Sequence, residues 1–453
     1  MKNLTKDGFS LKSSLFFILP SLIGVLLFMI PINFNGEITI PVAILSKFLA
    51  KSLGDSLTFI ITIAICTSAI VSVITKIFKP KFIVKNEFLN TLFNPSAIWF
   101  IARIIGAVFC VLALFKFGPE FIVNDSTGSF VLNDLLTILF TIFFFAGLLL
   151  PLLLNFGLLE FFGAVLTKVM RPIFTLPGRS SIDCITSWLG DGTLGIILTN
   201  KQYEEGFYSK REAAIISTTF SAVSITFSLI VIDTVGLSHL FIPFYLTVSI
   251  SGIIAAIIMP RIYPLCKIPN TYYNNQEKKN DESIPYGYSS FSWGYKKAID
   301  KASQNTDIKG FFIDGFKNVI DMWLGVLPVV MALATIALII AEYTSVFQIL
   351  GLPFIPYLKL LQVPEAVAAS QTLVVGFADM LLPSVLAANT IASDMTKFIV
   401  ACTSVSQLIY MSEVGGVLLG SKIPVSLKQL LIIFIERTII TLPVIVIAAN
   451  IIF

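Results

Sequence analysis

Two stretches of this chain follow the same order of residues: LPGRSSIDCITSWLGDGTLGIILTN, from Leu176 to Asn200, and VPEAVAASQTLVVGFADMLLPSVLAAN, from Val363 to Asn389. Each begins beside a proline, reaches a glycine with an aspartate close behind it, and ends on an asparagine. These residues are Pro177, Gly190, Asp191 and Asn200 in the first stretch, and Pro364, Gly376, Asp379 and Asn389 in the second. Paired, interrupted apolar segments in corresponding halves of a chain are typical of the binding site of a secondary transporter.

The composition indicates a membrane protein. Of the 453 residues, 56% are hydrophobic and 13% are charged, and the mean hydropathy is +0.89. A soluble domain of this length is expected to carry more charge. The net charge of +4 fits basic cytoplasmic loops and gives no indication of nucleic-acid binding. Five scattered cysteines without a CxxC spacing argue against a disulfide framework or a zinc site, and a single histidine excludes a cluster of histidine ligands.

Apolar runs of about 20 residues, the length that crosses a bilayer, recur along the chain. We predict an all-α polytopic membrane protein with about nine transmembrane helices and two re-entrant hairpins in an inverted repeat. The predicted parts are N-terminal scaffold helices (1–130), a first repeat (131–262), a cytoplasmic loop (263–309) and a second repeat (310–453). The expected spans are 13–33, 56–77, 97–117, 132–153, 211–233, 240–260, 322–342, 395–419 and 428–450, with broken hairpin segments at 176–205 and 364–392.

Basic residues predict the orientation of the chain. Lys2, Lys6 and Lys12 precede the first span, lysines fill the loop after the second span, and the loop after the third span carries little positive charge. The positive-inside rule therefore predicts a cytoplasmic N-terminus. Three crossings separate the corresponding spans 132–153 and 322–342, so the two repeats are expected to lie upside down relative to each other.

Polar residues in and after the hairpins are the candidate substrate ligands. The Gly-Asp-Gly-Thr sequence that ends at Thr193 favours a turn at the tip of the first hairpin. Asp191 either contacts a ligand there or caps the returning half-helix. Asp379 inside a bilayer must face a partner or water, which favours a functional role. The predicted substrate ligands are Ser180, Ser181, Asp191, Thr193, Asn200, Asp379, Asn389, Gln407 and Glu413.

Hydroxyl side chains crowd the span after each hairpin, as FSAVS (Phe220 to Ser224) and as CTSVS (Cys402 to Ser406). They can coordinate Na⁺ together with carbonyls that are freed where a helix unwinds, or they can form a close helix interface. A cluster in both copies favours a lining role. The candidate Na⁺ ligands are Ser221, Ser224, Ser404 and Ser406, and we predict no other cofactor and no metal site.

Several charged residues have structural interpretations. Ser209 and Glu212 have the spacing of a capping box at the start of a span. Glu436 and Arg437 are adjacent in the last span and face different sides of the helix, so each needs a partner on another helix. Glu413 is an available acid for Arg437. The sequence MSEVGG, from Met411 to Gly416, is expected to break the end of its span and to act as a hinge.

Longer strings resemble a known family. The stretch from Leu176 to Ser224 resembles the nucleoside-recognition Gate domain, and GFADMLLPSVLAA, SVSQLIYMSEVGGVLLGSKIPVSL and ERTIITLP resemble the YjiH family of bacterial Gate-containing membrane proteins. The resemblance covers about residues 130 to 453. It implies three scaffold helices, two inverted hairpin repeats, a homo-oligomer (dimer or trimer) and a distant similarity to concentrative nucleoside transporters. Those transporters carry a Gln-Thr-Glu motif in the first hairpin, where this chain has GDGTLG, so the substrate class stays open.

We therefore predict a secondary active transporter of a nucleoside-like or other small polar metabolite, coupled to Na⁺ or H⁺, in the bacterial inner membrane. An enzyme is not expected, because the hairpins have no nearby Ser/His pair and the chain has no HExxH motif. A metal-ion transporter with Cys184 and Cys402 as soft ligands is one alternative. A non-transporting membrane partner protein is the other.

Overall fold

The structure is a computed structural model that describes residues 11–30, 32–34, 37–190, 192–220, 223, 225–275, 283–305 and 308–453. This part of the chain is built from helices and one antiparallel pair of short strands, β1 (Ile32–Phe34) and β2 (Glu37–Thr39). The strands correct the all-α expectation. An Asn-Gly pair separates them in the sequence, and this pair favours a hairpin turn.

Six helical segments of the described chain are long and apolar enough to cross a membrane, which makes this a multi-pass membrane protein. A seventh expected span, 13–33, corresponds to α1 (Leu11–Met29), whose apolar part is shorter. The expected spans 211–233 and 395–419 are each interrupted, so neither is a continuous helix. The six segments are Ser56–Phe78, Ala97–Phe115, Glu120–Leu154, Ser238–Lys267, Lys309–Tyr343 and Leu427–Ile452.

The N-terminal helices form a scaffold against the second half of the chain. The helix α6 (Ala97–Phe115) packs along α19 (Leu327–Tyr343), and Gly106 allows the close approach, because a Cβ at this position would collide with the carbonyl of Pro328. The helix α2 (Pro41–Leu53) was not expected from the sequence, and it packs against α9 (Leu136–Leu149). The scaffold helices are α1, α2 (Pro41–Leu53), α3 (Ser56–Phe78), α4 (Lys81–Lys85), α5 (Glu87–Phe93) and α6 (Ala97–Phe115).

The two predicted repeats show the same order of elements. Each has a long helix, interfacial helices, two short arms that pack against each other, and a broken helix followed by a long one. The first contains α9 (Leu136–Leu149), α11 (Leu158–Phe174), α12 (Ser180–Ile185), a π-helical turn (Thr186–Gly190), α13 (Gly192–Glu204), α14 (Lys210–Thr219), α15 (Ile225–Thr234) and α16 (Phe241–Ile258). The second contains α18 (Ile308–Asp321), α19 (Leu327–Tyr343), α20 (Val346–Gly351), α21 (Phe354–Leu360), α22 (Ala366–Leu373), α23 (Leu382–Thr390), α24 (Asp394–Gln407), α25 (Val414–Gly420) and α26 (Leu427–Ile452).

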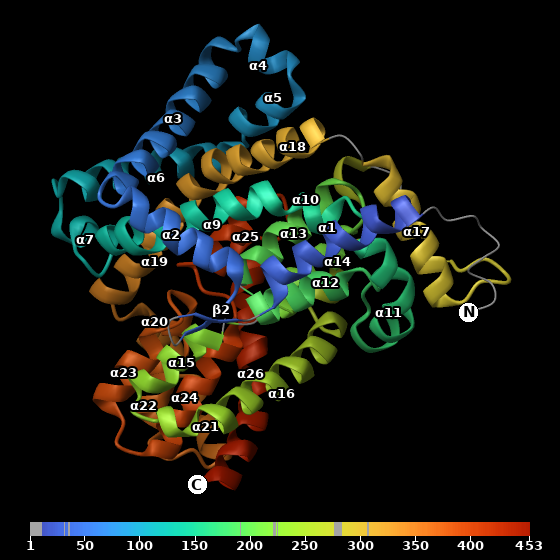
Figure 1. The fold of residues 1–453 in the computed structure, drawn as a ribbon. Coiled ribbons are helices and arrows are strands. Elements are labelled where there is room, and N and C mark those ends of the chain that lie inside the picture. Colours follow the sequence, from blue (N-terminus) through green and yellow to red (C-terminus); the bar gives the residue numbers. More distant parts are fainter. Residues whose placement is uncertain are drawn as a thin grey trace.

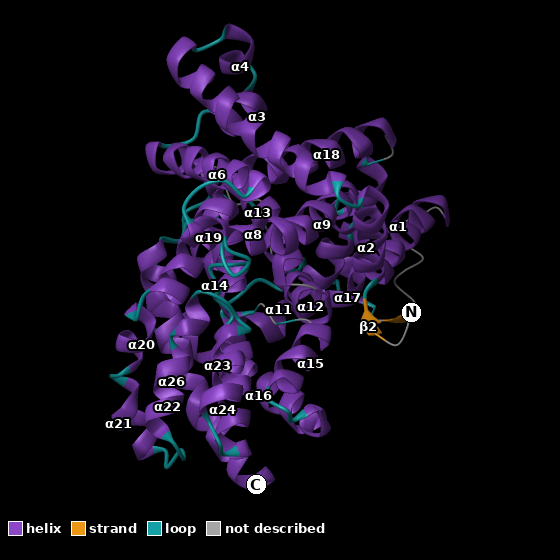
Figure 2. Cartoon of the chain, turned by 90° about the vertical axis from the view of Figure 1, so that its left-hand side faces the viewer, coloured by secondary structure: helices purple, strands orange, loops and turns teal. Residues whose placement is uncertain are grey.

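The second hairpin and its neighbours gather at one end of the molecule. Figures 1 and 2 show α22, α23 and α24 beside the C-terminal half of α26, and α3 and α4 at the opposite end. The first hairpin lies in the middle of the molecule, between these two groups. We call α12 to α13 hairpin 1 and α22 to α23 hairpin 2.

The expected cytoplasmic loop contains the helix α17 (Ser290–Gln304), which packs against α11 and α1. The hydroxyl of Tyr295 on α17 donates a hydrogen bond to Ser14 at the start of α1, with an O–O distance of 3.0 Å. The beginning of α1 and the helix α17 therefore lie side by side.

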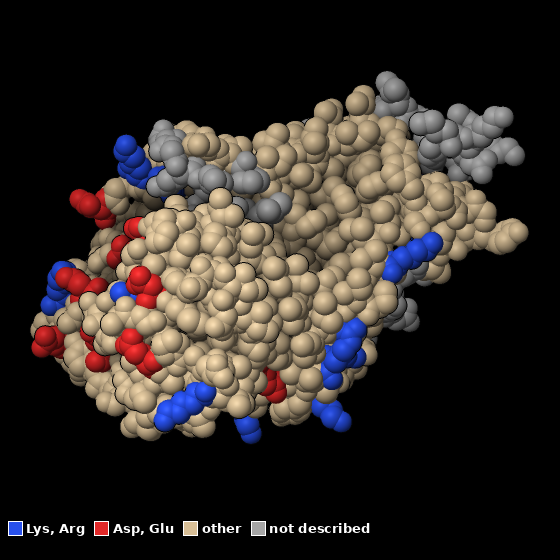
Figure 3. Space-filling view, turned by 90° about the horizontal axis from the view of Figure 1, so that it is seen from below, with Lys and Arg blue, Asp and Glu red and all other residues tan. Residues whose placement is uncertain are grey.

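Much of the surface is apolar. On α16 the side chains of Ile242, Leu246 and Ile250 share one face and are 73%, 57% and 52% exposed. Figure 3 shows a broad area without acidic or basic side chains, with the charged side chains gathered toward one end and along one edge. An apolar face of this size is expected to be covered by lipid.

Candidate functional site

A cavity of about 370 Å³ lies where hairpin 2 and both helix breaks meet, next to the start of the returning arm of hairpin 1. Gly192 contributes from hairpin 1, and Val223 lies in the break between α14 and α15. The turn between the two arms of hairpin 2 contributes Asp379 to Leu381, and the break between α24 and α25 contributes residues from Leu408 to Val414. The turn of hairpin 2 and the start of the returning arm of hairpin 1, at Gly192, thus border one space.

Asp379 joins the end of hairpin 2 to the break that follows it. One carboxylate oxygen accepts a hydrogen bond from the backbone N–H of Leu381 at 2.8 Å. The other accepts from the hydroxyl of Ser412, also at 2.8 Å. Asp379 lines the cavity as well, so it has both a partner and a free approach for a ligand.

Backbone hydrogen bonds reinforce this junction. The N–H of Met411 donates to the carbonyl of Phe377 at 2.8 Å, and the N–H of Ser412 donates to the carbonyl of Ala378 at 3.0 Å. The helical hydrogen bonds of α24 end at Gln407, so the backbone of residues 408–413 is available for these contacts. The predicted break within MSEVGG is confirmed at Met411 to Glu413, and it begins slightly earlier, at Leu408.

The cavity combines carboxylates with apolar walls. Asp134, Asp379 and Glu413 line it, together with apolar residues such as Leu139 and Phe227. Glu413 directly precedes the first turn of α25. Carboxylates accept hydrogen bonds, and within an apolar surrounding they favour a ligand that presents hydroxyl, amine or amide donors.

Several predicted substrate ligands lie elsewhere. Ser180 and Ser181 are buried at the base of hairpin 1 and donate to the carbonyls of Pro177 and Gly178 at 2.7 and 2.8 Å. Thr193 is buried next to Gly192 in the first turn of α13. Asn389 is exposed on α23 and donates to the carbonyl of Val385. Asp191, Ser221 and Ser224 lie outside the described residues.

Gln407 holds hairpin 2 from the outside of the cavity. It is fully buried, and its side-chain N–H group donates to the carbonyl of Leu373 in hairpin 2 and to the hydroxyl of Thr438 on α26, both at 2.9 Å. A Cβ on Gly376 would collide with the side-chain amide oxygen of Gln407, so this glycine allows the Gln407 side chain to approach hairpin 2 closely. The amide therefore connects three segments and does not line the cavity.

The predicted ion ligands Ser404 and Ser406 bond within their own helix. Their hydroxyls donate to the carbonyls of Ala401 and Cys402 at 2.9 and 2.7 Å. The Ser406 hydroxyl also lies 3.1 Å from that of Ser251 on α16. The two serines therefore lie at a helix interface, and this interface is next to a helix break.

Hairpin 1 contains a buried polar network between its two arms. Asp183 on α12 accepts hydrogen bonds from Thr199 at 3.0 Å and from Gln202 at 2.7 Å, both on α13. Arg179 donates to Gln202 at 2.7 Å, stacks on the ring of Phe207, and lies 3.7 Å from the carboxylate of Glu160 on α11. This network was not identified from the sequence.

A family model for the Gate domain, described as nucleoside recognition, matches residues 136–238. An uncharacterized protein of Alkalihalophilus pseudofirmus is 51% identical over 437 residues, which are 96% of this chain and 94% of the relative. This chain belongs to a family of Gate-domain membrane proteins. Two structures of CNTnw variants in an outward-facing state give TM-scores of 0.34 and 0.33 at 13% and 14% identity, over 96% of this chain and 96% and 97% of theirs.

The matched Gate region runs from the start of α9 to the residue after the turn that follows α15. It therefore contains hairpin 1 and the first helix break, while hairpin 2 lies outside it. The capping box expected at Ser209 and Glu212 is confirmed within the Gate region, and Glu212 also accepts from Arg171 at 2.8 Å.

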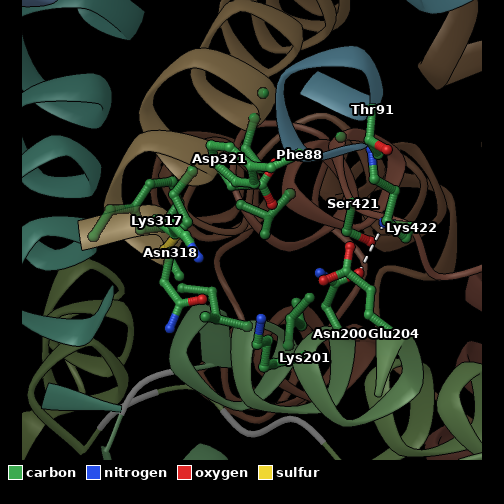
Figure 4. Close-up of a pocket in the computed structure, with 18 of the residues that line it drawn as sticks. Phe88, Thr91, Asn200, Lys201, Glu204, Lys317, Asn318, Asp321, Ser421 and Lys422 are labelled. Carbon is green, nitrogen blue, oxygen red and sulfur yellow. Dashed lines mark hydrogen bonds between the residues drawn. The ribbon is translucent and has the colours of Figure 1, made fainter. Parts of the chain in front are cut away.

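The Gate-domain protein has a second cavity, of about 650 Å³, on the other side of hairpin 1. Figure 4 shows Asn200, Lys201 and Glu204 pointing into it from α13, across from Lys317 and Asp321 of α18 and from Lys422. The Asn200 side chain accepts a hydrogen bond from the backbone N–H of Lys422 at 2.8 Å. Asn200 thus lines this second cavity instead of the one that contains Asp379.

Charge and burial act together on Glu204 in this second cavity. Burial, followed by the neighbouring Asp321 carboxylate, raises the pKa of Glu204 to about 7, although Lys201 and Lys422 oppose the shift.

No group of three or more His, Cys, Asp or Glu residues that could hold a metal ion is found among the residues that the structure describes.

Proposed function

We propose that this Gate-domain protein is a secondary active transporter of a small polar solute and that the cavity beside Asp379 is its substrate site. The observation that carries the proposal is the convergence of hairpin 2, the start of α13 and both helix breaks on one cavity. Broken helices near the middle of the membrane are where secondary transporters bind substrates, because their unwound backbone offers polar groups to a ligand.

Alternating access follows from the two cavities on either side of hairpin 1. The cavity of about 650 Å³ is lined by Lys201, Lys317 and Lys422, and basic residues favour the cytoplasmic side. We propose that it is the inner vestibule and that the cavity of about 370 Å³ opens toward the outside. Hairpins in inverted repeats, entering the membrane from opposite sides, would then close the two paths in turn.

The substrate class follows from the walls of the proposed site. Its volume falls in the range of about 300–1,000 Å³ that is usual for small-molecule sites. The carboxylates of Asp134, Asp379 and Glu413 favour hydroxyl or amine donors. The ribose of a nucleoside offers such donors, and so does the amino group of an amino acid or dipeptide. The Gate description favours the nucleoside-like class.

The remaining parts of the proposal concern the setting of the transporter. We propose a homo-oligomer, a dimer or trimer, in the bacterial inner membrane with a cytoplasmic N-terminus. An Na⁺ or H⁺ gradient drives uptake or export, since no nucleotide-binding loop is present in the sequence: Gly420-Ser421-Lys422 has Ser and Lys in the reverse of the order that a phosphate-binding loop needs.

A thermal-shift experiment on the purified full-length protein tests the proposal. Nucleosides, nucleobases, amino acids and dipeptides are added in Na⁺ and in K⁺, at pH 6 and pH 8. A ligand at about 100 times its Kd stabilises the folded state by about 2.7 kcal/mol, which raises the melting temperature. We expect one solute class to do so, and an effect of Na⁺ or of pH to indicate the coupling ion.

Variants locate the binding site. Asp379→Asn and Glu413→Gln should each reduce the ligand-induced shift, because the ligand loses a charged acceptor. Asp394→Asn is the matched control. Asp394 is also an acidic residue of α24, but it lies in the first turn of this helix and its side chain is exposed. A shift that is equal in all four proteins would place the ligand elsewhere. If no solute shifts the wild type, the non-transporting partner protein becomes the better interpretation.

A further inference from the structure

Arg437 occupies an unusual position in the membrane-spanning part of the protein. It lies in the middle of α26 and is 2% exposed. No carboxylate lies within 4 Å of its guanidinium in the described chain, so neither Glu413 nor its neighbour Glu436 is its ion-pair partner. A buried cation needs compensating negative charge, and here the compensation comes from backbone carbonyls.

The guanidinium connects the C-terminal ends of the two half-helices that precede the breaks. Its Nε donates to the carbonyl of Ser406, in the last turn of α24. One terminal nitrogen donates at 3.1 Å to the carbonyl of Thr219, the last residue of α14. Two broken helices from the two repeats therefore end at one positively charged side chain from a third helix.

Physical chemistry explains why a cation belongs at this point. The last four carbonyls of a helix have no partner within the helix, and the helix dipole adds about half a negative charge at that end. Where α14 and α24 break inside the protein, water cannot fully compensate these carbonyls.

The space around the guanidinium is small. A cavity of about 20 Å³ borders Arg437, Ser406 and Trp188 of hairpin 1. One water molecule needs about 10–15 Å³ by this measure, so the cavity has room for one water molecule and no solute. The crossing point is therefore filled by the side chain itself.

We propose that Arg437 is a tethered cation that takes the place of a mobile Na⁺ at the crossing of the two half-helices. Half-helix C-terminal ends and unwound carbonyls coordinate Na⁺ in many secondary transporters. Here the same carbonyl-rich position is permanently neutralised, so the assembled crossing does not require Na⁺. The consequence for transport, that no Na⁺ enters or leaves this point during the cycle, rests on the proposed transporter function.

Thermal melting of the full-length protein without substrate tests the tethered cation. The proteins are wild type, Arg437→Lys, Arg437→Gln and Arg437→Ala, each in NaCl and in KCl. We expect Na⁺ to raise the melting temperature of the wild type, relative to K⁺, by no more than it raises that of Arg437→Gln, because the arginine already occupies the crossing. The lysine variant should melt above the glutamine variant, because it keeps a tethered positive charge. Arg437→Ala should lose roughly 3–6 °C, as expected for loss of two charge-assisted hydrogen bonds in a protein of this size.

Chemical rescue supplies a readout that a purely structural role would not move. Low-millimolar guanidinium should restore much of the melting temperature of Arg437→Ala, because the free ion can occupy the vacated place. Ile433→Ala is the matched control: Ile433 is a fully buried residue one turn earlier on α26, and its truncation should cost a similar amount without rescue.

Three results would overturn the proposal: a stabilisation of the wild type by NaCl over KCl that Arg437→Gln lacks, equal stability of the lysine and glutamine variants, or equal guanidinium effects on Arg437→Ala and Ile433→Ala. The experiment uses no substrate, so a failed search for a transported solute would leave its outcome unaffected. If Arg437→Ala does not fold, the comparison of lysine with glutamine still decides the need for a positive charge.

Discussion

Hairpin 1 and hairpin 2 have the same order of elements, but different groups hold them in place. In hairpin 1 the polar contacts run between its own two arms, from Asp183 to Thr199 and Gln202. In hairpin 2 they run outward, from Asp379 to the break after α24 and from Leu373 to Gln407. Hairpin 1 is therefore stabilised as a unit, whereas the position of hairpin 2 depends on the helix that follows it.

The bases of the two hairpins show the opposite contrast. The Glu365 carboxylate closes the base of hairpin 2 by accepting from the N–H groups of Ala392 and Ser393, and both it and Ala392 lie at the exposed end. The base of hairpin 1 is anchored to α11, where Gly178 donates to Thr167 and Arg179 approaches Glu160. A motion of α24 should carry hairpin 2 with it and leave hairpin 1 attached to α11, whereas α25 is also linked to hairpin 1 through Asn200 and Lys422.

The largest expected effect is on the network inside hairpin 1. Asp183→Ala leaves Thr199 and Gln202 buried without their acceptor, and removal of one partner from a buried charged network typically costs about 3–5 kcal/mol. We expect a large fall in melting temperature of the purified protein. Asp183→Asn keeps one acceptor oxygen and should lose less. If Asp379→Ala lowered the melting temperature more than Asp183→Ala, the contrast between the hairpins would be wrong.

A smaller loss is expected where hairpin 2 meets α26. Gln407→Leu keeps the approximate volume but removes both 2.9 Å hydrogen bonds, so the Leu373 carbonyl and the Thr438 hydroxyl each lose one donor. The expected cost is about 1–3 kcal/mol. A double-mutant cycle with Thr438→Val isolates the contact with α26, and coupling below about 0.5 kcal/mol would show that Gln407 acts through hairpin 2 alone.

Loss of a single hydrogen bond at the turn of hairpin 2 should affect the affinity for the solute more than the stability of the protein. Ser412→Ala removes the donor at 2.8 Å from Asp379, which costs about 1 kcal/mol in unfolding free energy. Because the freed carboxylate lines the cavity, we expect a larger change in the affinity for the solute than in the melting temperature. Ser303→Ala, on the exposed face of α17, is the control. An unchanged affinity would assign Ser412 a packing role only.

The sequence predicted the features that local residue order determines. The two hairpin segments, the capping box at Ser209 and the break within MSEVGG all depend on residues within a few positions of each other. The broken helix after hairpin 1 was expected as one span, because its interruption lies in a run of small and hydroxyl residues that a helix also tolerates.

Contacts between distant helices were not predictable in the same way. The partners of Arg437 are backbone carbonyls of Ser406 and Thr219, and any residue type has a carbonyl. The sequence therefore showed that this arginine needs a partner, and it offered Glu413, but it contained no signal for a carbonyl. Gln407 was predicted to face a substrate because amides often do, yet its position depends on the approach of Gly376, which is set by the packing of hairpin 2.

A further expected effect concerns the pH dependence of stability at the end of α13 in hairpin 1. The pKa of Glu204 is raised to about 7 in the folded protein from an ordinary value of 4.5, so the folded state binds the proton more tightly than the unfolded state. The contribution of protonated Glu204 to stability is therefore complete below pH 4.5 and is lost as the pH rises through 7. We expect the melting temperature of the wild type to fall between pH 5 and pH 8 by more than that of Glu204→Gln. Glu120→Gln, on the far side of the scaffold, should keep the wild-type slope. Equal slopes in the wild type and Glu204→Gln would show that water enters the second cavity freely and that hairpin 1 is less enclosed there than its inner network suggests.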